Sequence, residues 1–301
     1  MLVLTLLFSL RKSTILNWLL TFTLSILSLT VIASQPIIVF PKVKSNVAYS
    51  KVTALPFRNA DQQIDYGEDP LQYALLWRAK KATNVIKLDN KQQNPLVILI
   101  HGGCWLSAYD IQHTYALSTG LSQAGFNVWS LEYRRSGDKG GGWPGTYDDV
   151  KAGILASARY NNAEFDLSHS VLVGHSAGGH LALLAGGAFK QLKGVIGLAA
   201  ITDIAEYAVG TNSCQQVTQH FMQGMPKDKP TEYSMANPSQ QPLHVNTFIV
   251  QGDKDNIVPA FKLDKLERKV IMLEGVGHFD WIHPGSEAFN TLTQQLNGLV
   301  K

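Results

Sequence analysis

Between residues 95 and 200, short continuous apolar runs alternate with longer segments in which apolar residues recur at helical spacing. Continuous runs of Val, Ile and Leu are typical of strands that helices cover on both faces, and recurrence every three or four residues indicates amphipathic helices. The runs PLVILI, NVWSL, SVLVG and GVIGL therefore predict four strands. Segments 113–125 and 146–160 predict two of the intervening helices.

This alternation is interrupted between residues 203 and 242, where polar and turn residues dominate. It then resumes with the runs NTFIVQG and KVIMLEG, which predict two more strands, and with predicted helices at 259–269 and 286–300. We expect Thr146 or Asp148 to cap the helix that runs to about residue 160. Strands that alternate with helices predict parallel βαβ units, so the expected fold is α/β, with a doubly wound and mostly parallel sheet.

The first 33 residues differ from the rest of the chain. Arg11 and Lys12 precede an apolar run of about 20 residues, a pattern typical of an export signal. A second apolar run precedes the charges, and the later run is long enough to span a bilayer, so an uncleaved membrane anchor and a buried helix are the alternatives. The signal and the anchor both predict that residues 34–301 form an exported domain, periplasmic or secreted, whose only membrane association is through residues 1–33.

Composition narrows the function classes. The 301 residues are 45% hydrophobic and 16% charged, as in a globular protein. Without Arg11 and Lys12 the formal charge falls from +3 to +1, which predicts no nucleic-acid partner. Cys104 and Cys214 match no metal or redox spacing, and the sequence favours two free thiols over a disulfide. Neither a metal nor another cofactor is expected.

Ser176 is the predicted nucleophile. It is the centre of Gly-His-Ser-Ala-Gly, which lies between a predicted strand and a predicted helix. Such a turn holds the serine in a strained conformation that only small neighbours allow. Serine needs a base, and His278 is the preferred candidate because it follows the strand KVIML and a glycine. His283 lies further along, where we expect a packing or surface role.

The base needs a carboxylate to orient it, and three aspartates follow predicted strands. Asp255 is preferred because the turn after Gly252 should direct it at the histidine. Asp253 is then expected to stabilise that turn, and Asp203 to cap a helix. In an open parallel sheet, ligands bind beyond the carboxyl ends of the strands, where all these candidates are expected.

An oxyanion-binding loop is predicted at His101-Gly-Gly-Cys-Trp, directly after the first of these strands. Its expected backbone donors are Gly103 and Cys104, together with Ala177, the residue that follows the nucleophile. We expect His101 to hold the loop by a hydrogen bond. Trp105 is a candidate substrate-binding residue because it adjoins the loop, although a core position is the alternative.

The ordered set of motifs resembles the α/β-hydrolase fold. HGGCW, EYRR, GGGWPGTYDDV, GHSAGGH, GDKDNIVP and GVGH together resemble the HGGxW branch, which includes kynurenine formamidase-like and BD-FAE-like carboxylesterases. The resemblance implies a triad of Ser176, Asp255 and His278, an oxyanion loop at 102–104, and a cap formed by the insertion at about 203–242. Cys104 departs from the glycine-like residue of the family, which leaves backbone donation intact.

The expected function is hydrolysis of small carboxylic esters through an acyl-serine intermediate, because the insertion is short and polar. A formamidase or small amidase would use the same machinery, although the predicted export argues against the intracellular substrate of kynurenine formamidases. A hydrolase-like binding protein without activity is the alternative from another class. The expected partner is a small-molecule ester or amide.

Overall fold

The computed structural model describes residues 37–80, 86–88, 91–260 and 268–301. Two segments with predictions, residues 1–33 and most of 259–269, lie outside these ranges. Within the described ranges, no helix combines the length and apolar character that a membrane span requires. Residues 37–301 form one compact unit.

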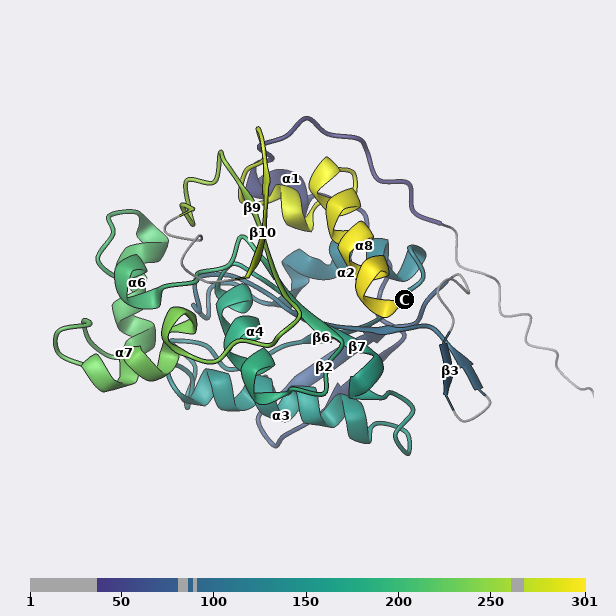
Figure 1. Ribbon diagram of the computed structural model, residues 1–301, viewed down its shortest axis with the longest axis horizontal. Helices are drawn as coiled ribbons and strands as arrows, with labels where there is room; N and C mark the ends of the chain where they lie inside the picture. The colour runs from purple at the N-terminus through teal and green to yellow at the C-terminus, as the bar shows by residue number, and fades with distance from the viewer. Residues whose placement is uncertain (1–36, 81–85, 89–90, 261–267) are drawn as a thin grey trace, which may run out of the picture. The chain divides into compact units, whose positions relative to one another are not determined.

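A twisted eight-stranded sheet forms the centre of this unit (Figure 1). The strand order is β1-β2-β6-β5-β7-β8-β9-β10; the β1/β2 and β2/β6 pairs are antiparallel, and the other pairs are parallel. The strands of this sheet are β1 (Gln62–Asp65), β2 (Tyr73–Trp77), β5 (Leu96–Ile100), β6 (Asn127–Leu131), β7 (Ser170–His175), β8 (Gly194–Leu198), β9 (Thr247–Gly252) and β10 (Lys269–Leu273). A separate hairpin joins β3 (Ile86–Leu88) and β4 (Lys91–Gln93).

Helices cover both faces of the sheet, with α1, α2 and α8 on one side and α3 and α4 on the other (Figure 1). The helices are α1 (Tyr49–Thr53), α2 (Tyr115–Gln123), α3 (Gly145–Arg159), α4 (Ala177–Ala188), α5 (Ile204–Tyr207), α6 (Ser213–Met222), α7 (Pro230–Ala236) and α8 (Glu287–Val300). Four short 3-10 turns accompany them in the described chain: η1 (Ile111–Thr114), η2 (Leu167–His169), η3 (Pro238–Gln240) and η5 (Asp280–Ile282).

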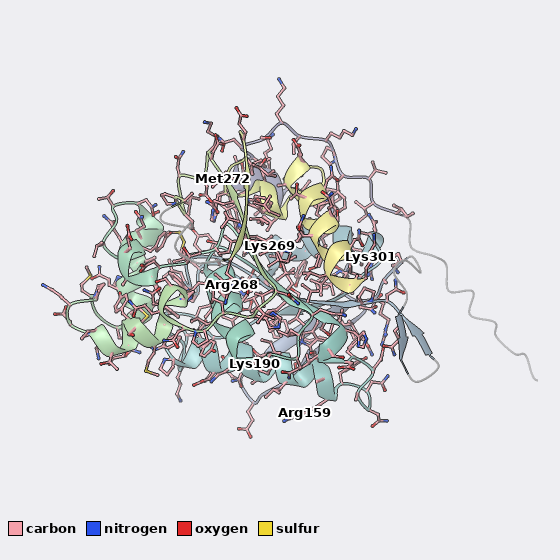
Figure 2. The ribbon with its side chains drawn as sticks, in the orientation of Figure 1. Arg159, Lys190, Arg268, Lys269, Met272 and Lys301 are labelled. Atoms are coloured by element: carbon pink, nitrogen blue, oxygen red, sulfur yellow. A yellow bond between two sulfur atoms is a disulfide. The ribbon has the colours of Figure 1, made fainter. Side chains whose placement is uncertain are left out.

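The strand side chains alternate between two apolar layers, as the pleat of a strand requires. On β5, Ile98 packs into the layer beneath α3 and α4, whereas Val97 and Leu99 pack into the layer beneath α2 and α8. Both layers are buried, which explains why the central strands are apolar throughout. β10 is one of the two edge strands, and Lys269 and Met272 reach the surface there (Figure 2). An exposed lysine discourages pairing of such an edge with another strand.

The predicted fold class is confirmed, with one local correction at the start of α3. Helix α3 begins at Gly145 and has no side-chain cap. Thr146 instead donates from its hydroxyl to the carbonyl of Arg134 (2.6 Å) and accepts from Gly142 N–H. The polar insertion contains α5, α6 and α7, and α6 and α7 lie together at one end of the sheet (Figure 1).

The sheet order places the predicted site at its topological switch point. β5 pairs with β6 on one side and with β7 on the other, so the chain reverses its direction across the sheet at β5. The loop after β5 and the turn after β7 therefore leave the sheet side by side, which is where open α/β sheets bind ligands.

Candidate active site

Ser176 lies on a sharp turn between β7 and α4. Its backbone angles, φ 57° and ψ −121°, are rare for a residue with a side chain, and its N–H donates to the carbonyl of Leu198 (2.8 Å). A β-carbon on Gly174 would overlap the carbonyl of Gly178, and one on Gly178 would overlap the carbonyl of His101. Both glycines are therefore sterically required for this turn.

The loop after β5 approaches the serine closely. A β-carbon on Gly102 would lie 2.9 Å from the carbonyl oxygen of His175 and 3.0 Å from Cβ of Ser176. Among the described residues, the backbone N–H groups of Gly103, Cys104 and Ala177 donate no hydrogen bond. Such N–H groups suit a developing oxyanion, and Ala177 is also the first residue of α4, where the helix dipole favours negative charge.

His101 fixes the start of this loop. Its Nδ1 lies 2.7 Å from the carbonyl oxygen of Gly102, and its Nε2 lies 3.0 Å from Oε1 of Glu132. The ring stacks on Tyr133, whose hydroxyl donates to the carbonyl of His101 (2.6 Å). His101 is fully buried. His101 therefore connects the oxyanion loop to buried residues of the core.

The predicted acid and base are in contact. Nδ1 of His278 lies 2.8 Å from Oδ2 of Asp255, and because a carboxylate only accepts, Nδ1 carries the proton. The other carboxylate oxygen, Oδ1, accepts from the N–H groups of Ile257 (2.9 Å) and Val258 (2.8 Å). Asp255 is therefore fixed by its own turn, and it holds the His278 ring through Nδ1 and not through Nε2.

Gln251 was missed by the sequence analysis. This buried residue on β9 donates from Nε2 to Oδ2 of Asp255 (3.2 Å) and to the carbonyl of Val258 (2.6 Å). It joins both ends of the turn that carries the acid. Its position inside an apolar strand, four residues before Asp255, was the available signal, because a buried amide needs partners.

The alternative residues have structural roles. Asp253 accepts from Gly275 N–H (2.6 Å) at the turn, and Asp203 caps α5 by accepting from Glu206 N–H (3.0 Å). His283 is buried and accepts at Nδ1 from Gly285 N–H (3.1 Å). In the described ranges, no group of three or more His, Cys, Asp or Glu side chains could hold a metal ion.

A cavity of about 210 Å³ opens beside the serine. It is smaller than the roughly 300–1,000 Å³ of typical drug-sized ligand sites. Ser176 and His278 both line it, and so do residues from the oxyanion loop, the start of α6 and the N-terminal segment. The lining residues are Tyr49, Gly103, Cys104, Tyr109, His113, His175, Ser176, Asn212, Ser213, Cys214, Ile257, His278 and Phe279.

The prediction that Trp105 binds substrate is wrong. Trp105 has 0% exposure and does not line the cavity; its ring stacks on Phe221 at a centroid distance of 4.7 Å. Positive φ angles at Cys104 (51°) and Trp105 (57°) turn the loop back toward the core. Trp143 is also buried there, next to Phe221.

Aromatic residues from outside the predicted motifs form a wall of the cavity. Tyr49 on α1 contacts Phe279 (5.2 Å between ring centroids) and Tyr109 (6.0 Å). Asp280 positions this helix, because its carboxylate accepts from the N–H groups of Asn46 (2.9 Å) and Val47 (3.1 Å). The loop that carries His278 therefore also positions the aromatic wall of the cavity.

Two other histidines on this cavity are uncharged at neutral pH. Burial, followed by the charge of His278, holds the pKa of His175 well below its ordinary value. Burial, followed by the neighbouring His101, lowers the pKa of His113 to about 3. Nε2 of His175 lies 3.0 Å from the carbonyl oxygen of His278 and, in the neutral ring, donates to it.

Cys104 and Cys214 form a disulfide, so the expectation of two free thiols is wrong. The bond joins the oxyanion loop to the second residue of α6, with 5.3 Å between the Cα atoms. The two cysteines are 110 residues apart in the sequence, and no local spacing indicates that they meet.

Comparison with known proteins relates this arrangement to esterases. The BD-FAE family model matches residues 85–270. Esterase LipC of Mycobacterium tuberculosis (strain ATCC 25618 / H37Rv) is 33% identical over 127 residues, or 42% of this chain and 29% of that protein. The chain thus matches less than a third of the length of this relative.

Solved structures show the same fold. Esterase B from Lactobacillus rhamnosis (HN001) superposes with a TM-score of 0.65 and 18% identity, over 84% of this chain and 90% of that one. A truncated carbohydrate esterase from gut microbiota gives a TM-score of 0.63 and 20% identity, over 80% and 97% of the two chains. These likenesses establish the α/β-hydrolase architecture.

Proposed function

This chain belongs to the BD-FAE family, and we propose that it hydrolyses small carboxylic esters through an acyl-serine intermediate. One observation carries the proposal: the Asp255–His278 hydrogen bond lies at a cavity that Ser176 also lines. The similarity to LipC, which is named an esterase, supports ester hydrolysis over formamide hydrolysis.

The first half of the reaction forms the acyl-enzyme. Nε2 of His278 accepts the hydroxyl proton of Ser176 while the serine oxygen attacks the ester carbonyl carbon. Asp255 holds the ring in the tautomer that leaves Nε2 free and stabilises the imidazolium that forms. The imidazolium then protonates the departing alcohol, and the acyl group stays on the serine.

The second half releases the acid. His278 removes a proton from water, the hydroxide attacks the acyl-serine carbonyl, and the proton returns to the serine oxygen as the acid leaves. In both halves a negative oxygen develops, and the N–H groups of Gly103, Cys104 and Ala177 are its proposed donors. Loss of one such donor typically lowers kcat by about 100- to 1,000-fold.

The cavity limits the size of the substrate. A volume of about 210 Å³ corresponds to about seven water-sized groups, at roughly 30 Å³ each. We therefore expect acetyl and butyryl esters to be hydrolysed faster than esters of long-chain acids.

Covalent labelling and a substrate panel test the proposal. A fluorophosphonate probe should label the wild type but not Ser176→Ala, and the wild type should hydrolyse p-nitrophenyl acetate and butyrate. N-formylkynurenine should be turned over much more slowly. Labelling that persists in Ser176→Ala would refute the nucleophile, and faster turnover of N-formylkynurenine would favour the formamidase.

We also propose that residues 1–33 export the domain. A disulfide is typical of oxidising compartments outside the cytosol, which supports export. N-terminal sequencing of protein recovered outside the cytoplasm distinguishes a cleaved signal, which would give a start near residue 34, from an intact anchor. Recovery of the protein only from the cytoplasm would contradict export.

A further inference from the structure

We propose that the Cys104–Cys214 disulfide is a positioning element of the active site, which braces the oxyanion loop against the turn that carries Asp255. This inference rests on the proposed ester hydrolysis and adds to it a redox requirement. Its parts are the strained oxyanion loop, the start of α6 and the turn that carries Asp255.

The loop is held in a conformation that it would not adopt alone. Gly103, Cys104 and Trp105 have successive positive φ angles of 110°, 51° and 57°, and two of these residues are not glycine. Each such residue is destabilising and persists only where its surroundings enforce its conformation. The backbone conformation of Trp105 is enforced by the packing of its ring on Phe221. The disulfide supplies the corresponding constraint at Cys104.

The other end of the disulfide is anchored to the acid turn. Cys214 lies in the first turn of α6, whose capping box pairs Asn212 with Gln215. Asn212 also donates from Nδ2 to the carbonyls of Asn256 (3.2 Å) and Ile257 (3.0 Å). Ile257 N–H in turn donates to the carboxylate of Asp255 (2.9 Å), so a connected path joins the oxyanion loop to the acid.

Both cysteines line the reaction cavity and are only partly buried, so a small dithiol can reach the bond. Reduction by dithiothreitol transfers two electrons and two protons to the cysteine sulfurs, which become two thiols. The S–S bond breaks, and the dithiothreitol closes to its cyclic disulfide. No other covalent bond of the site changes.

Loosening the loop should affect turnover more than binding. The Cys104 N–H is proposed to bind the oxyanion of the transition state, which the ground-state ester lacks. A misplacement of about 1 Å can cost about 100-fold in rate. We therefore expect reduction to lower kcat by about 10- to 100-fold, with KM changed by less than about threefold.

The test compares Cys104→Ser, Cys214→Ser and the double variant with the wild type, each with and without dithiothreitol. Steady-state constants for p-nitrophenyl acetate are measured at a temperature where circular dichroism shows each protein folded. All three variants should have the same low kcat as the reduced wild type. Dithiothreitol should change only the wild type, so the variants control for its other effects.

The proposed positioning role of the disulfide would be overturned by an unchanged kcat in the folded, reduced wild type. It would also be overturned if a rise in KM accounted for the loss of activity, or if activity fell only in proportion to the loss of folded protein. If a variant does not fold, the reduced wild type still decides. Fluorophosphonate labelling of Ser176 in the oxidised wild type separates the two proposals. Without labelling, the ester-hydrolase proposal itself fails; with labelling but no redox effect, only the brace fails.

Discussion

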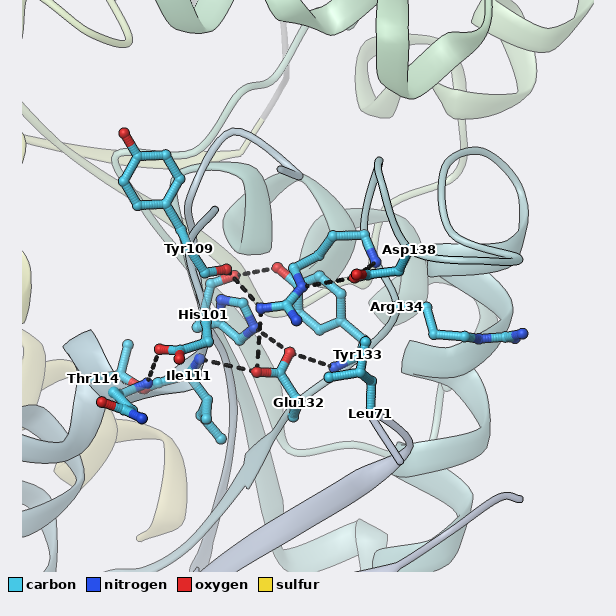
Figure 3. Close-up of polar contacts among 12 residues, drawn as sticks. Leu71, His101, Tyr109, Ile111, Thr114, Glu132, Tyr133, Arg134 and Asp138 are labelled. Carbon is cyan, nitrogen blue, oxygen red and sulfur yellow. Dashed lines mark hydrogen bonds and ion pairs between the residues drawn. The ribbon is translucent and has the colours of Figure 1, made fainter. Parts of the chain in front are cut away.

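The buried carboxylate of Glu132 offers a sharp test of what holds the oxyanion loop. Glu132 is 1% exposed and lies at the end of β6. It accepts from the N–H groups of Tyr133 (2.8 Å) and Ile111 (3.1 Å) and from the Arg135 guanidinium (3.3 Å), and lies 3.0 Å from His101 Nε2 (Figure 3). Glu132→Gln keeps the shape of the side chain, but it removes the negative charge and replaces one accepting oxygen by an NH₂ group that donates.

The expected loss of stability follows from these contacts. Removing one partner of a buried ion pair typically costs about 3–5 kcal/mol, because the other charge is left without compensation. Arg135 keeps Asp138 (3.3 Å) and the carbonyl of Tyr109 (2.7 Å), which lowers this figure. We expect Glu132→Gln to lower the free energy of unfolding by about 3 kcal/mol at pH 7. Activity should fall too, since His101 would lose the contact that fixes the loop.

The pH dependence of this loss identifies its cause. Burial alone would raise the pKa of Glu132, but His101 and Arg135, together with the Tyr133 N–H, bring it below its usual 4.5. The folded protein therefore holds the ionised form more strongly than the unfolded chain does. The stability so gained is fully present above about pH 4.5 and is lost as the pH falls through the lowered folded pKa.

Urea denaturation of the wild type and Glu132→Gln between pH 3 and pH 8 measures both effects. Asp148→Asn is the matched control, because it removes the same charge from an exposed pair with Lys151 (2.9 Å), where we expect a change of less than about 1 kcal/mol. A loss of stability in Glu132→Gln at pH 7 no larger than in this control would refute the role of the buried carboxylate. That role would also be refuted if the gap to the wild type did not narrow below pH 4.5.

Three further predictions concern other parts of the site. Gly178→Ala should prevent folding, because the added β-carbon would overlap the carbonyl of His101. A thermal melt should then show no cooperative transition, and a wild-type melting curve would contradict this. Gln251→Leu should lower kcat by at least about tenfold because Asp255 loses a donor, by analogy with the roughly 1.5–3 kcal/mol of a hydrogen bond to a charged group. Unchanged steady-state kinetics would exclude that role. Burial lowers the pKa of His180 to about 4, so its contribution to stability is full above about pH 6.5 and falls down to about pH 4, by up to about 1.4 kcal/mol per pH unit. His180→Gln should flatten this slope in denaturation curves, and an unchanged slope would show that His180 is not its source.

The fold and the chemistry of the site could be predicted because they share one local signal. In a parallel sheet covered by helices, the strands are continuous apolar runs, and the residues that follow them gather at one edge. Ser176, Asp255 and His278 each follow such an apolar run in the sequence, which is why they could be predicted as candidates. The structure brings Asp255 and His278 into contact, with Ser176 at the same cavity.

The features that the sequence analysis missed depend on contacts between distant segments. No spacing rule pairs Cys104 with Cys214 across 110 residues. Tyr49 lies at the cavity on a helix whose preceding residues, 46–47, are bound by Asp280, far away in the sequence. The direction of the Trp105 side chain depends on a backbone conformation that residue types alone do not specify.

These distant contacts have a common consequence for function. The proposed reacting groups follow strands of the sheet, whereas the cavity around them is also lined by two segments outside the sheet. Asp280 holds α1, and the disulfide and Asn212 hold the start of α6. Changes in those segments can therefore reshape the cavity without moving β7 or β9. Because the disulfide also ends on the oxyanion loop, α6 is the one of these two segments whose displacement should alter the rate of the chemical step as well as the choice of substrate.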